Sequence, residues 1–305
     1  MGTVTLPNTS FVGGTFDGTY YMAPEGVNGI IRIYTPPVGG NGAATLVATE
    51  DASPNNIGAI TWDPNRGMLW GAFADNVYLI DLGNKTVSGP VVSSTFMFNP
   101  GVGGSGLIDG IAYDGGDDTL YYSPDVDLNV YQFSLGTDIN GANPALGTLM
   151  NTIAPENAGG VADGLVSGVA IGSANTLYIG RNGDQEIRRV DKTTGAFVST
   201  FAQTVGRAEG PVCDSVTYAS KSAILSKEAF GDFYEAFEVE AGTCPLLGDP
   251  PPASVGGATS FLVTESGTSA GMIAILAGVA AIAFTLLVAT GWYARRRLQP
   301  GERSE

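Results

Sequence analysis

One pattern returns five times along this chain of 305 residues. A short apolar run with a bulky centre follows a turn, as in "MLWGA" from Met68 and "TLYIG" from Thr176. Gly, Asn and Asp divide such runs, because they tolerate positive φ and bond to the local backbone. The central residues of the five copies are Tyr21, Trp70, Tyr121, Tyr178 and Leu225. Their intervals of 49, 51, 57 and 47 residues predict a structural repeat of about 50 residues.

Three further strand-like runs recur in a fixed order around each copy. The run before it reads "GAITWD" from Gly58 and "SVTYAS" from Ser215, and similar runs start at Gly110 and Gly168. A third run reads "NVYLID" from Asn76, and fourth runs start at residues 44, 90, 147 and 196. A four-stranded unit that repeats every 50 residues or so is typical of a propeller blade, which buries both faces by stacking on its neighbours.

The repeated runs also resemble those of a known family. "GIAYDGGDDTLYYS" and "TLYIGRNGDQEIRRVDKTTG" are similar to the units of NHL/YVTN-like β-propellers, and the resemblance covers residues 11 to about 245. It implies blades packed face to face around a central axis, with the first strand of each blade lining a channel. It implies no particular function, because such propellers serve as enzymes, scaffolds and binding modules.

Five units predict a ring of five blades, and a six- or seven-bladed ring that lacks its start is the alternative. The segment "GTVTL" at residues 2–6 resembles the fourth strands, whereas the last unit has no distinct fourth strand of its own. We therefore expect the N-terminal segment to complete the fifth blade and close the ring.

The composition fits this all-β prediction. Apolar residues make up 44% of the chain, which is enough for a large core, and 44 residues are Gly. Glycine is costly inside helices but useful in the many turns of a strand-rich fold. The expected ectodomain covers residues 1–244.

Charge and the absence of histidine exclude several classes of function. The formal net charge of −16 would repel phosphate backbones, so we expect no nucleic-acid partner. The chain contains no His. Ser-His-Asp and Cys-His nucleophiles and imidazole metal sites are therefore excluded, which leaves carboxylate chemistry and oxygen-ligated metals.

The C-terminal part predicts a membrane anchor. Residues 271–294 are 24 residues without a charge, enough for one transmembrane helix, and "RRR" follows at 295–297. The positive-inside rule then places a basic tail, 295–305, in the cytoplasm or virion interior and the propeller outside. A Pro/Gly/Ser/Thr stalk is expected at 245–270.

Two further expectations concern this export. The order of spacer, helix and Arg cluster resembles the PEP-CTERM and LPXTG sorting tails of prokaryotic surface proteins, but the recognition peptide of either type is missing. The opening "MGTVTLPNTS" has no apolar signal region, so we expect that a signal peptide was removed or that the gene start is incomplete.

The two cysteines, Cys213 and Cys244, are 31 residues apart. In an exported protein we expect a disulfide between them, whereas in a cytosolic protein they would be two buried thiols. The bond would tie the first strand of the fifth blade to the end of that blade, the unit that must hold the ring shut.

The candidate site is a rim of polar residues where the innermost strands begin. Its members are Asn56, Asp109, Asp163, Glu209 and Asp214. Carboxylate and amide oxygens suit Ca²⁺, so calcium is the one possible cofactor. The alternative is that these side chains cap turns, as Asp before Gly commonly does.

Three functions remain open. The first is a single-pass surface protein, on a cell membrane or viral envelope, whose propeller binds an extracellular protein or glycan ligand through exposed loops. The second is a carboxylate-dependent hydrolase that acts on a glycan, since two carboxyl groups can cleave a glycosidic bond. The third is a structural envelope component, for which lateral packing would matter more than the channel mouth.

Overall fold

The computed structural model describes residues 2–7, 13–25, 28–102, 108–125, 127–136, 146–181, 185–202, 208–218, 221–228, 231–240 and 242–245. Residues 1–254 form one compact unit, and residues 255–305 fall outside it. The predicted transmembrane helix and basic tail, and nearly all of the stalk, lie beyond the described residues. Within the described part, no helix is both long and apolar enough to cross a bilayer.

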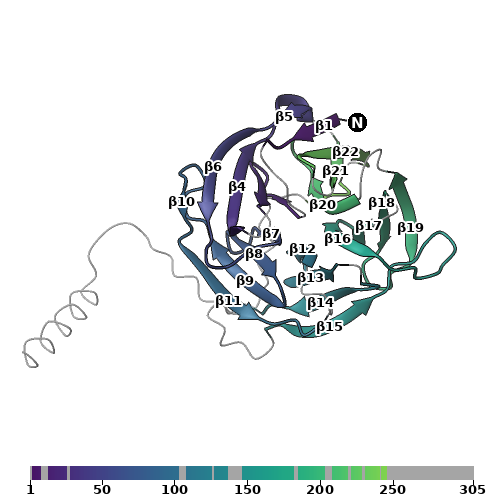
Figure 1. Ribbon diagram of the computed structural model, residues 1–305. Helices are drawn as coiled ribbons and strands as arrows, with labels where there is room; N and C mark the ends of the chain where they lie inside the picture. Colours follow the sequence, from purple (N-terminus) through teal and green to yellow (C-terminus); the bar gives the residue numbers. More distant parts are fainter. Residues whose placement is uncertain are drawn as a thin grey trace, which may run out of the picture. The chain divides into compact units, whose positions relative to one another are not determined.

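Five mainly antiparallel sheets surround a central axis, as Figure 1 shows, and each sheet is one blade. The innermost strands of blades one to five are β2 (Thr15–Phe16), β7 (Ala59–Asp63), β12 (Ile108–Asp114), β16 (Val166–Gly172) and β20 (Ala208–Asp214). The second strands are β3 (Tyr21–Pro24), β8 (Met68–Phe73), β13 (Thr119–Pro124), β17 (Thr176–Arg181) and β21 (Ser222–Glu228). The all-β, five-bladed propeller predicted from the repeat is confirmed.

The outer half of each blade follows the same plan. The third strands are β4 (Ile30–Thr35), β9 (Asn76–Asp81), β14 (Val130–Ser134), β18 (Glu186–Asp191) and β22 (Phe233–Val239). The fourth strands are β6 (Thr45–Asp51), β11 (Ser93–Phe98), β15 (Thr148–Ile153), β19 (Phe197–Ala202) and β1 (Gly2–Thr5). Two short strands, β5 (Gly42–Ala43) and β10 (Gly89–Pro90), and a 3₁₀ turn at Val38–Gly40 complete the described elements.

The N-terminal strand closes the ring, as the sequence predicted. β1 pairs antiparallel with β22, from Gly2 opposite Ala236 to Thr5 opposite Phe233. The first described strand is thus the fourth strand of the last blade. Because β20, β21 and β22 of blade five come from residues 208–239, this pairing joins the two ends of the propeller.

The prediction for the innermost strand of blade five is wrong by several residues. The sequence pattern placed it at "SVTYAS" from Ser215, whereas β20 ends at Asp214. The Oδ1 atom of Asp214 accepts hydrogen bonds from the backbone N–H groups of Val216 and Thr217, both at 2.9 Å. These two residues are therefore held in a turn, and the strand consists of the preceding segment.

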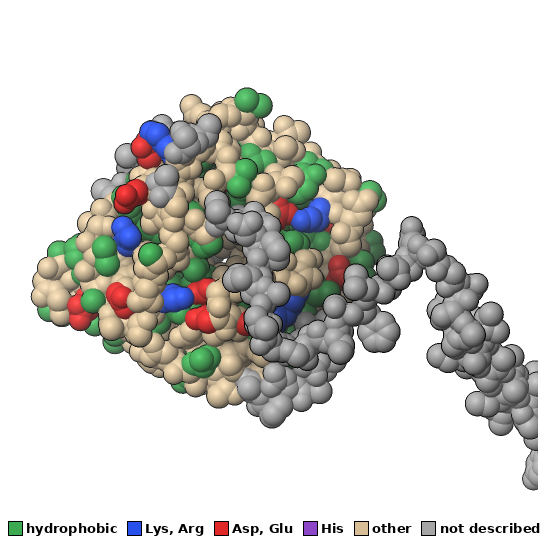
Figure 2. All heavy atoms as spheres, turned by 180° about the vertical axis from the view of Figure 1, so that it is seen from behind, with side chains coloured by type: hydrophobic (Ala, Val, Ile, Leu, Met, Phe, Trp, Pro, Cys, Tyr) green, Lys and Arg blue, Asp and Glu red, His purple; other side chains and the backbone are tan. Residues whose placement is uncertain are grey.

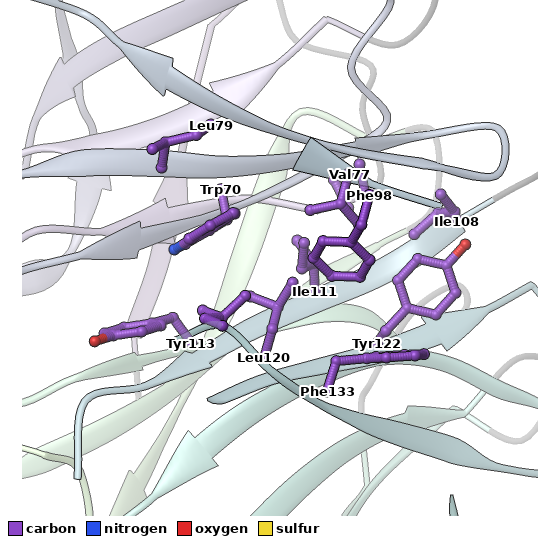
Figure 3. Packing of buried hydrophobic residues seen from close by; sticks show 13 residues of the cluster. Trp70, Val77, Leu79, Phe98, Ile108, Ile111, Tyr113, Leu120, Tyr122 and Phe133 are labelled. Atoms are coloured by element: carbon purple, nitrogen blue, oxygen red, sulfur yellow. The ribbon is translucent and has the colours of Figure 1, made fainter. Parts of the chain in front are cut away.

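The core lies between neighbouring blades. Figure 3 shows one part of it, where Trp70 and Phe98 of blade two face Leu120 and Phe133 of blade three. The rings of Phe98 and Phe133 have centroids 5.6 Å apart, within the range favoured by aromatic pairs. Burial of such side chains contributes roughly 1.5–3 kcal/mol each, so the contacts between sheets stabilise the ring.

The innermost strands touch at the axis through glycines. A Cβ atom on Gly168 would lie 2.4 Å from the backbone nitrogen of Gly210, and one on Gly110 would lie 2.6 Å from the Cα atom of Gly168. Gly168 also has φ of +152°, which side chains with a Cβ rarely adopt. Blades three, four and five can therefore approach this closely only because Gly110 and Gly168 lack side chains.

A repeated aspartate ends the innermost strand of four blades. Asp17, Asp63, Asp114 and Asp214 each use Oδ1 to accept backbone N–H groups of the following turn. Their Oδ2 atoms accept a hydrogen bond from a second donor, and in three cases this donor belongs to the next blade. Asp17 accepts from Lys85, Asp114 accepts from Lys192, and Asp214 accepts from the Tyr21 hydroxyl at 2.5 Å. Asp17, Asp114 and Asp214 thus each fix both a turn and a junction between blades.

Arg66 makes the corresponding connection between blades two and three. In its own blade it donates to Asp63 Oδ2 at 2.7 Å. In the next blade it donates to both carboxylate oxygens of Asp118, at 2.7 and 2.9 Å, and to the carbonyl oxygen of Gly136 at 2.6 Å. Burial lowers the pKa of Arg66, but hydrogen bonds with Asp118 and Asp63 outweigh this and raise it above its ordinary value. On the face in Figure 2, acidic and basic side chains lie beside one another at several places.

Blade four lacks this aspartate, and a covalent bond lies at its junction with blade five. Ser173 begins the corresponding turn, and its N–H donates to the carbonyl of Thr243 at 2.7 Å. The next residue, Cys244, forms the predicted disulfide with Cys213 of β20, with Cα atoms 5.4 Å apart. The C-terminal end of the propeller is therefore held against both blades.

Candidate functional site

Four of the five predicted rim residues lie where the innermost strands begin. Asp109 and Glu209 are the second residues of β12 and β20, and Asn56 and Asp163 lie in the segments leading into β7 and β16. The prediction is wrong for Asp214, which is the last residue of β20 and therefore lies at the opposite end of the propeller from Glu209. Its carboxylate caps a turn and bonds to Tyr21.

The carboxylates near the axis are buried. Glu209 is fully buried opposite Lys227, its partner in the register of β20 and β21, and Asp109 is also buried. Among the residues that the structure describes, no three His, Cys, Asp or Glu side chains are grouped so that they could hold a metal ion. The calcium prediction therefore finds no supporting geometry in this part of the chain.

The described entrance to the ring includes residues 154–165, which we call the entrance loop. The side chain of Asn157 organises its first half, because Oδ1 accepts the N–H groups of Gly159 at 2.8 Å and Val161 at 3.2 Å. The backbone N–H of Asn157 also donates to the carbonyl of Val161 at 2.9 Å. The loop therefore has a defined shape although most of its second half is exposed.

Asp163 fixes the second half of the entrance loop to blade four. It accepts hydrogen bonds from Arg181 at 2.5 Å and from Arg188 at 2.7 Å, and both arginines are buried. Arg188 also pairs with Glu186 at 2.5 Å. Burial raises the pKa of Asp163, but hydrogen bonds from Arg188 and Asn157 and the charges of the two arginines outweigh it and lower the pKa to about 2.

The segment after Asp163 has an unfavourable backbone and exposes apolar side chains. Leu165 has φ of +61°, a conformation that residues other than glycine adopt infrequently, and its side chain is exposed. Val161 in the loop and Leu128 in the adjoining turn of blade three are exposed as well. We call Leu128, Val161 and Leu165 the entrance patch.

The turn that carries Leu128 is joined to the entrance loop. The N–H of Val166 donates to the carbonyl of Asp127 at 3.0 Å, and a Cβ atom on Gly164 would lie 2.1 Å from a methyl carbon of Leu128. Asp127 in turn accepts the N–H groups of Leu128 and Asn129. Two blades therefore present the patch together on a fixed backbone.

Comparison with known proteins supports the fold and no more than the fold. No model of a known protein family matches the chain, and no curated protein matches it. A solved structure, the glutaminyl cyclase of Myxococcus xanthus, is similar, with a TM-score of 0.52 over 79% of this chain and 100% of that chain. The two sequences are 13% identical. The likeness is one of architecture. The resemblance to NHL/YVTN-like units and to sorting tails stays a prediction.

Sequence reasoning found Asp163 but missed the residues that make it important. Arg181 and Arg188 end β17 and occupy β18, in runs that were interpreted only as strands. One signal was available, since both are cations at one end of blade four in a chain with 14 basic residues. The positive φ of Leu165 leaves no such signal, because nothing in the sequence distinguishes it from other loop leucines.

Acidification should weaken the attachment of the entrance loop. Because the folded pKa of Asp163 lies below its ordinary value of 3.8, the carboxylate stabilises the fold above about pH 4, and this contribution is lost as the pH falls towards 2. We expect Asp163→Asn to be less stable than the natural chain at neutral pH, with a difference that shrinks on acidification. Chemical denaturation at a series of pH values checks this, and a constant difference would contradict it.

Proposed function

We propose that the chain is a surface-anchored binding propeller whose contact surface is the entrance patch. The observation that carries this proposal is Leu165, an exposed leucine with positive φ beside a carboxylate clamped by two buried arginines. A strained backbone costs of order 1–3 kcal/mol and persists where the surroundings impose it, commonly at ligand-contacting positions. The strain has no evident structural benefit here, so we infer that it serves to present the leucine.

The ligand that fits this surface is a protein. The entrance patch offers three aliphatic side chains on a rigid backbone, and apolar anchors of this kind are typical of protein contacts. A glycosidase would instead need two carboxyl groups accessible to a sugar. Asp109 and Glu209, the candidates for that role, are both buried.

The anchor belongs to the proposal as well. Residues 271–294 are uncharged and are followed by three arginines, which supports a single membrane span with the propeller outside. The Cys213–Cys244 disulfide supports the same placement, because disulfides persist in oxidising compartments. A propeller held in this way would carry the entrance patch on a cell surface or viral envelope.

The test uses the positive φ of Leu165, which glycine can adopt without strain. A random peptide library is displayed on phage and selected on the full-length chain, and selected peptides are then measured against Leu165→Gly and Val87→Gly. Glycine tolerates positive φ, so Leu165→Gly should leave the free energy of unfolding unchanged or slightly higher. We expect peptide affinity to fall at least tenfold for Leu165→Gly only. Equal affinity for both variants would exclude the entrance patch as the contact surface.

A second candidate is an enzyme, favoured by the ionisable groups buried near the axis. Asp109, Glu209 and Lys227 lie at the end of the ring where the innermost strands begin, and buried charged groups are common at catalytic sites. The similar structure from Myxococcus xanthus is a glutaminyl cyclase. In such a cyclisation the α-amine attacks the side-chain amide carbon and ammonia leaves.

Incubation with a peptide that begins with glutamine tests this candidate directly. Ammonia release above the uncatalysed rate, abolished in Glu209→Gln and retained in Leu165→Gly, would make the enzyme the better assignment. No release from the folded, disulfide-bonded chain would exclude this reaction.

A further inference from the structure

The outermost strands of blades two, three and four differ from the rest of the chain in charge. β11, β15 and β19 read SSTFMF, TLMNTI and FVSTFA. These eighteen residues include no Asp, Glu, Lys, Arg or Pro, although charged residues make up 14% of the whole chain. Charged residues and proline are the usual means by which exposed strand edges avoid unwanted contacts. The outer rim of these three blades therefore lacks that protection.

The same strands expose large apolar side chains. Phe96 of β11 is 54% exposed, Met150 of β15 is 59% exposed and Val198 of β19 is 50% exposed, and Leu149 beside Met150 is 44% exposed. We call Phe96, Leu149, Met150 and Val198 the outer rim patch. In Figure 1, β11, β15 and β19 follow one another around the outside of the ring. The apolar side chains thus come from three successive blades.

In blades one and five, a further short strand covers the outer edge of the fourth strand. The short strand β10 pairs in parallel with β6 of blade one, and β5 pairs in parallel with β1 of blade five. In both cases a neighbouring blade supplies the covering strand. Among the described residues no such strand pairs with β11, β15 or β19.

A β-bulge in each of the three strands indicates what kind of contact the rim can make. The register shifts at Met97 in β11, at Met150 in β15 and at Val198 in β19. A bulge interrupts the ladder and bends the strand, which opposes the addition of a further strand. The rim is therefore suited to side-chain packing against a folded surface, and not to capture of an extended peptide.

Charge favours a second copy of this chain as that surface. A basic partner protein would have no electrostatic attraction to an uncharged rim. Carboxylates elsewhere on a protein of net charge −16 would attract it more strongly. Two copies repel each other in most orientations, and the repulsion is weakest where both present uncharged strands. Burial of the exposed apolar side chains of both rims would supply the favourable free energy of such a contact.

We propose that copies of this chain pack side by side through the outer rim patch. The contact is independent of the entrance patch, which lies at one end of the ring and not on its circumference. Anchored copies would then form pairs or arrays with their entrance patches left open.

The test compares two double variants that carry the same added charge. Met150→Glu with Val198→Glu places two carboxylates in the outer rim patch. Val87→Glu with Val216→Glu places two at sites of similar exposure, 60% and 51%, outside it. Sedimentation of the full-length chain in mild detergent, over a wide concentration range at physiological salt, gives the dissociation constant of self-association for each.

We expect the natural chain to associate and the rim variant to weaken association at least tenfold, with the control changed by less than threefold. A chain that stays monomeric at the highest concentration would overturn the proposal. Association that the two variants weaken equally would overturn it too, because the added charge alone would then explain the effect. Association that neither variant weakens would place the contact elsewhere, for example in the apolar segment at 271–294.

Discussion

Replacing Arg66 with methionine should lower the free energy of unfolding by about 3–5 kcal/mol, because the change leaves buried carboxylate without its cationic partner. Asp63 is fully buried, and Arg66 is its cationic contact as well as the bridge to Asp118 and Gly136 of the next blade. Trp70 would still donate to Asp63 Oδ2, but a neutral donor cannot balance the charge.

Urea denaturation followed by tryptophan fluorescence measures this effect, since Trp70 contacts the same carboxylate. The matched control is Lys221→Met, which breaks the exposed pair between Lys221 and Glu238 at 2.6 Å. Exposed pairs are typically worth less than about 1 kcal/mol. Similar losses in the two variants would show that the Arg66 network does not hold blades two and three together.

Removal of the disulfide should cost about 3–4 kcal/mol, as expected for a bond that closes a loop of 31 residues in the unfolded chain. The variant is Cys213→Ala with Cys244→Ala. The loss should be concentrated in blade five, because the C-terminal end of the propeller then loses its covalent bond to β20 and keeps the hydrogen bonds from Ser173 to Gly242 and Thr243 and from Ser215 to Pro245.

Two measurements separate this explanation from a general loss of packing. Hydrogen exchange should become faster in β20, β22 and β1 before it changes in blades two and three. A reducing agent should destabilise the natural chain by a similar amount and leave the double variant unaffected. Uniformly faster exchange across all five blades would contradict the local role given to the bond.

Most of the fold could be predicted because the repeat fixes the order, the spacing and the apolar runs of the strands. Each blade must bury both faces, so the strands near Trp70, Tyr121 and Tyr178 are fixed by their apolar runs and by the turns around them. Pairing of residues 2–5 with the last blade followed from the count of fourth strands. The strands β5 and β10 could not be foreseen, since two residues carry no periodic pattern and depend on a neighbouring blade.

The error at Ser215 and the misplacement of Asp214 have one physical cause. Both predictions placed the start of the innermost strand where β20 in fact ends. The sequence "VCDS" resembles the segment before an innermost strand as much as the segment after one. The repeated aspartates at Asp63 and Asp114 could have corrected this, since each follows an apolar run and precedes a turn. Aligning on those aspartates would have placed Asp214 at the end of β20.

The candidate site was less accessible to sequence reasoning. A pattern can identify Asp163 as a polar residue before a strand, but it cannot show that Arg181 and Arg188 meet it from two other strands. Nor can it show a backbone held at positive φ at Leu165, which depends on the clamp and on the neighbouring turn. These features arise only when distant segments pack together.

Closure of the ring by β1 also determines when the protein can become a finished ring during its synthesis. Residues 2–5 leave the ribosome before their partner, β22, which follows more than two hundred residues later. Until then blades one to four must stay soluble as an open arc, with the uncovered flank of blade one exposed to other chains. Folding factors that act on this nascent arc, and the speed of elongation, are therefore expected to influence the yield of closed rings more than the stability of any single blade.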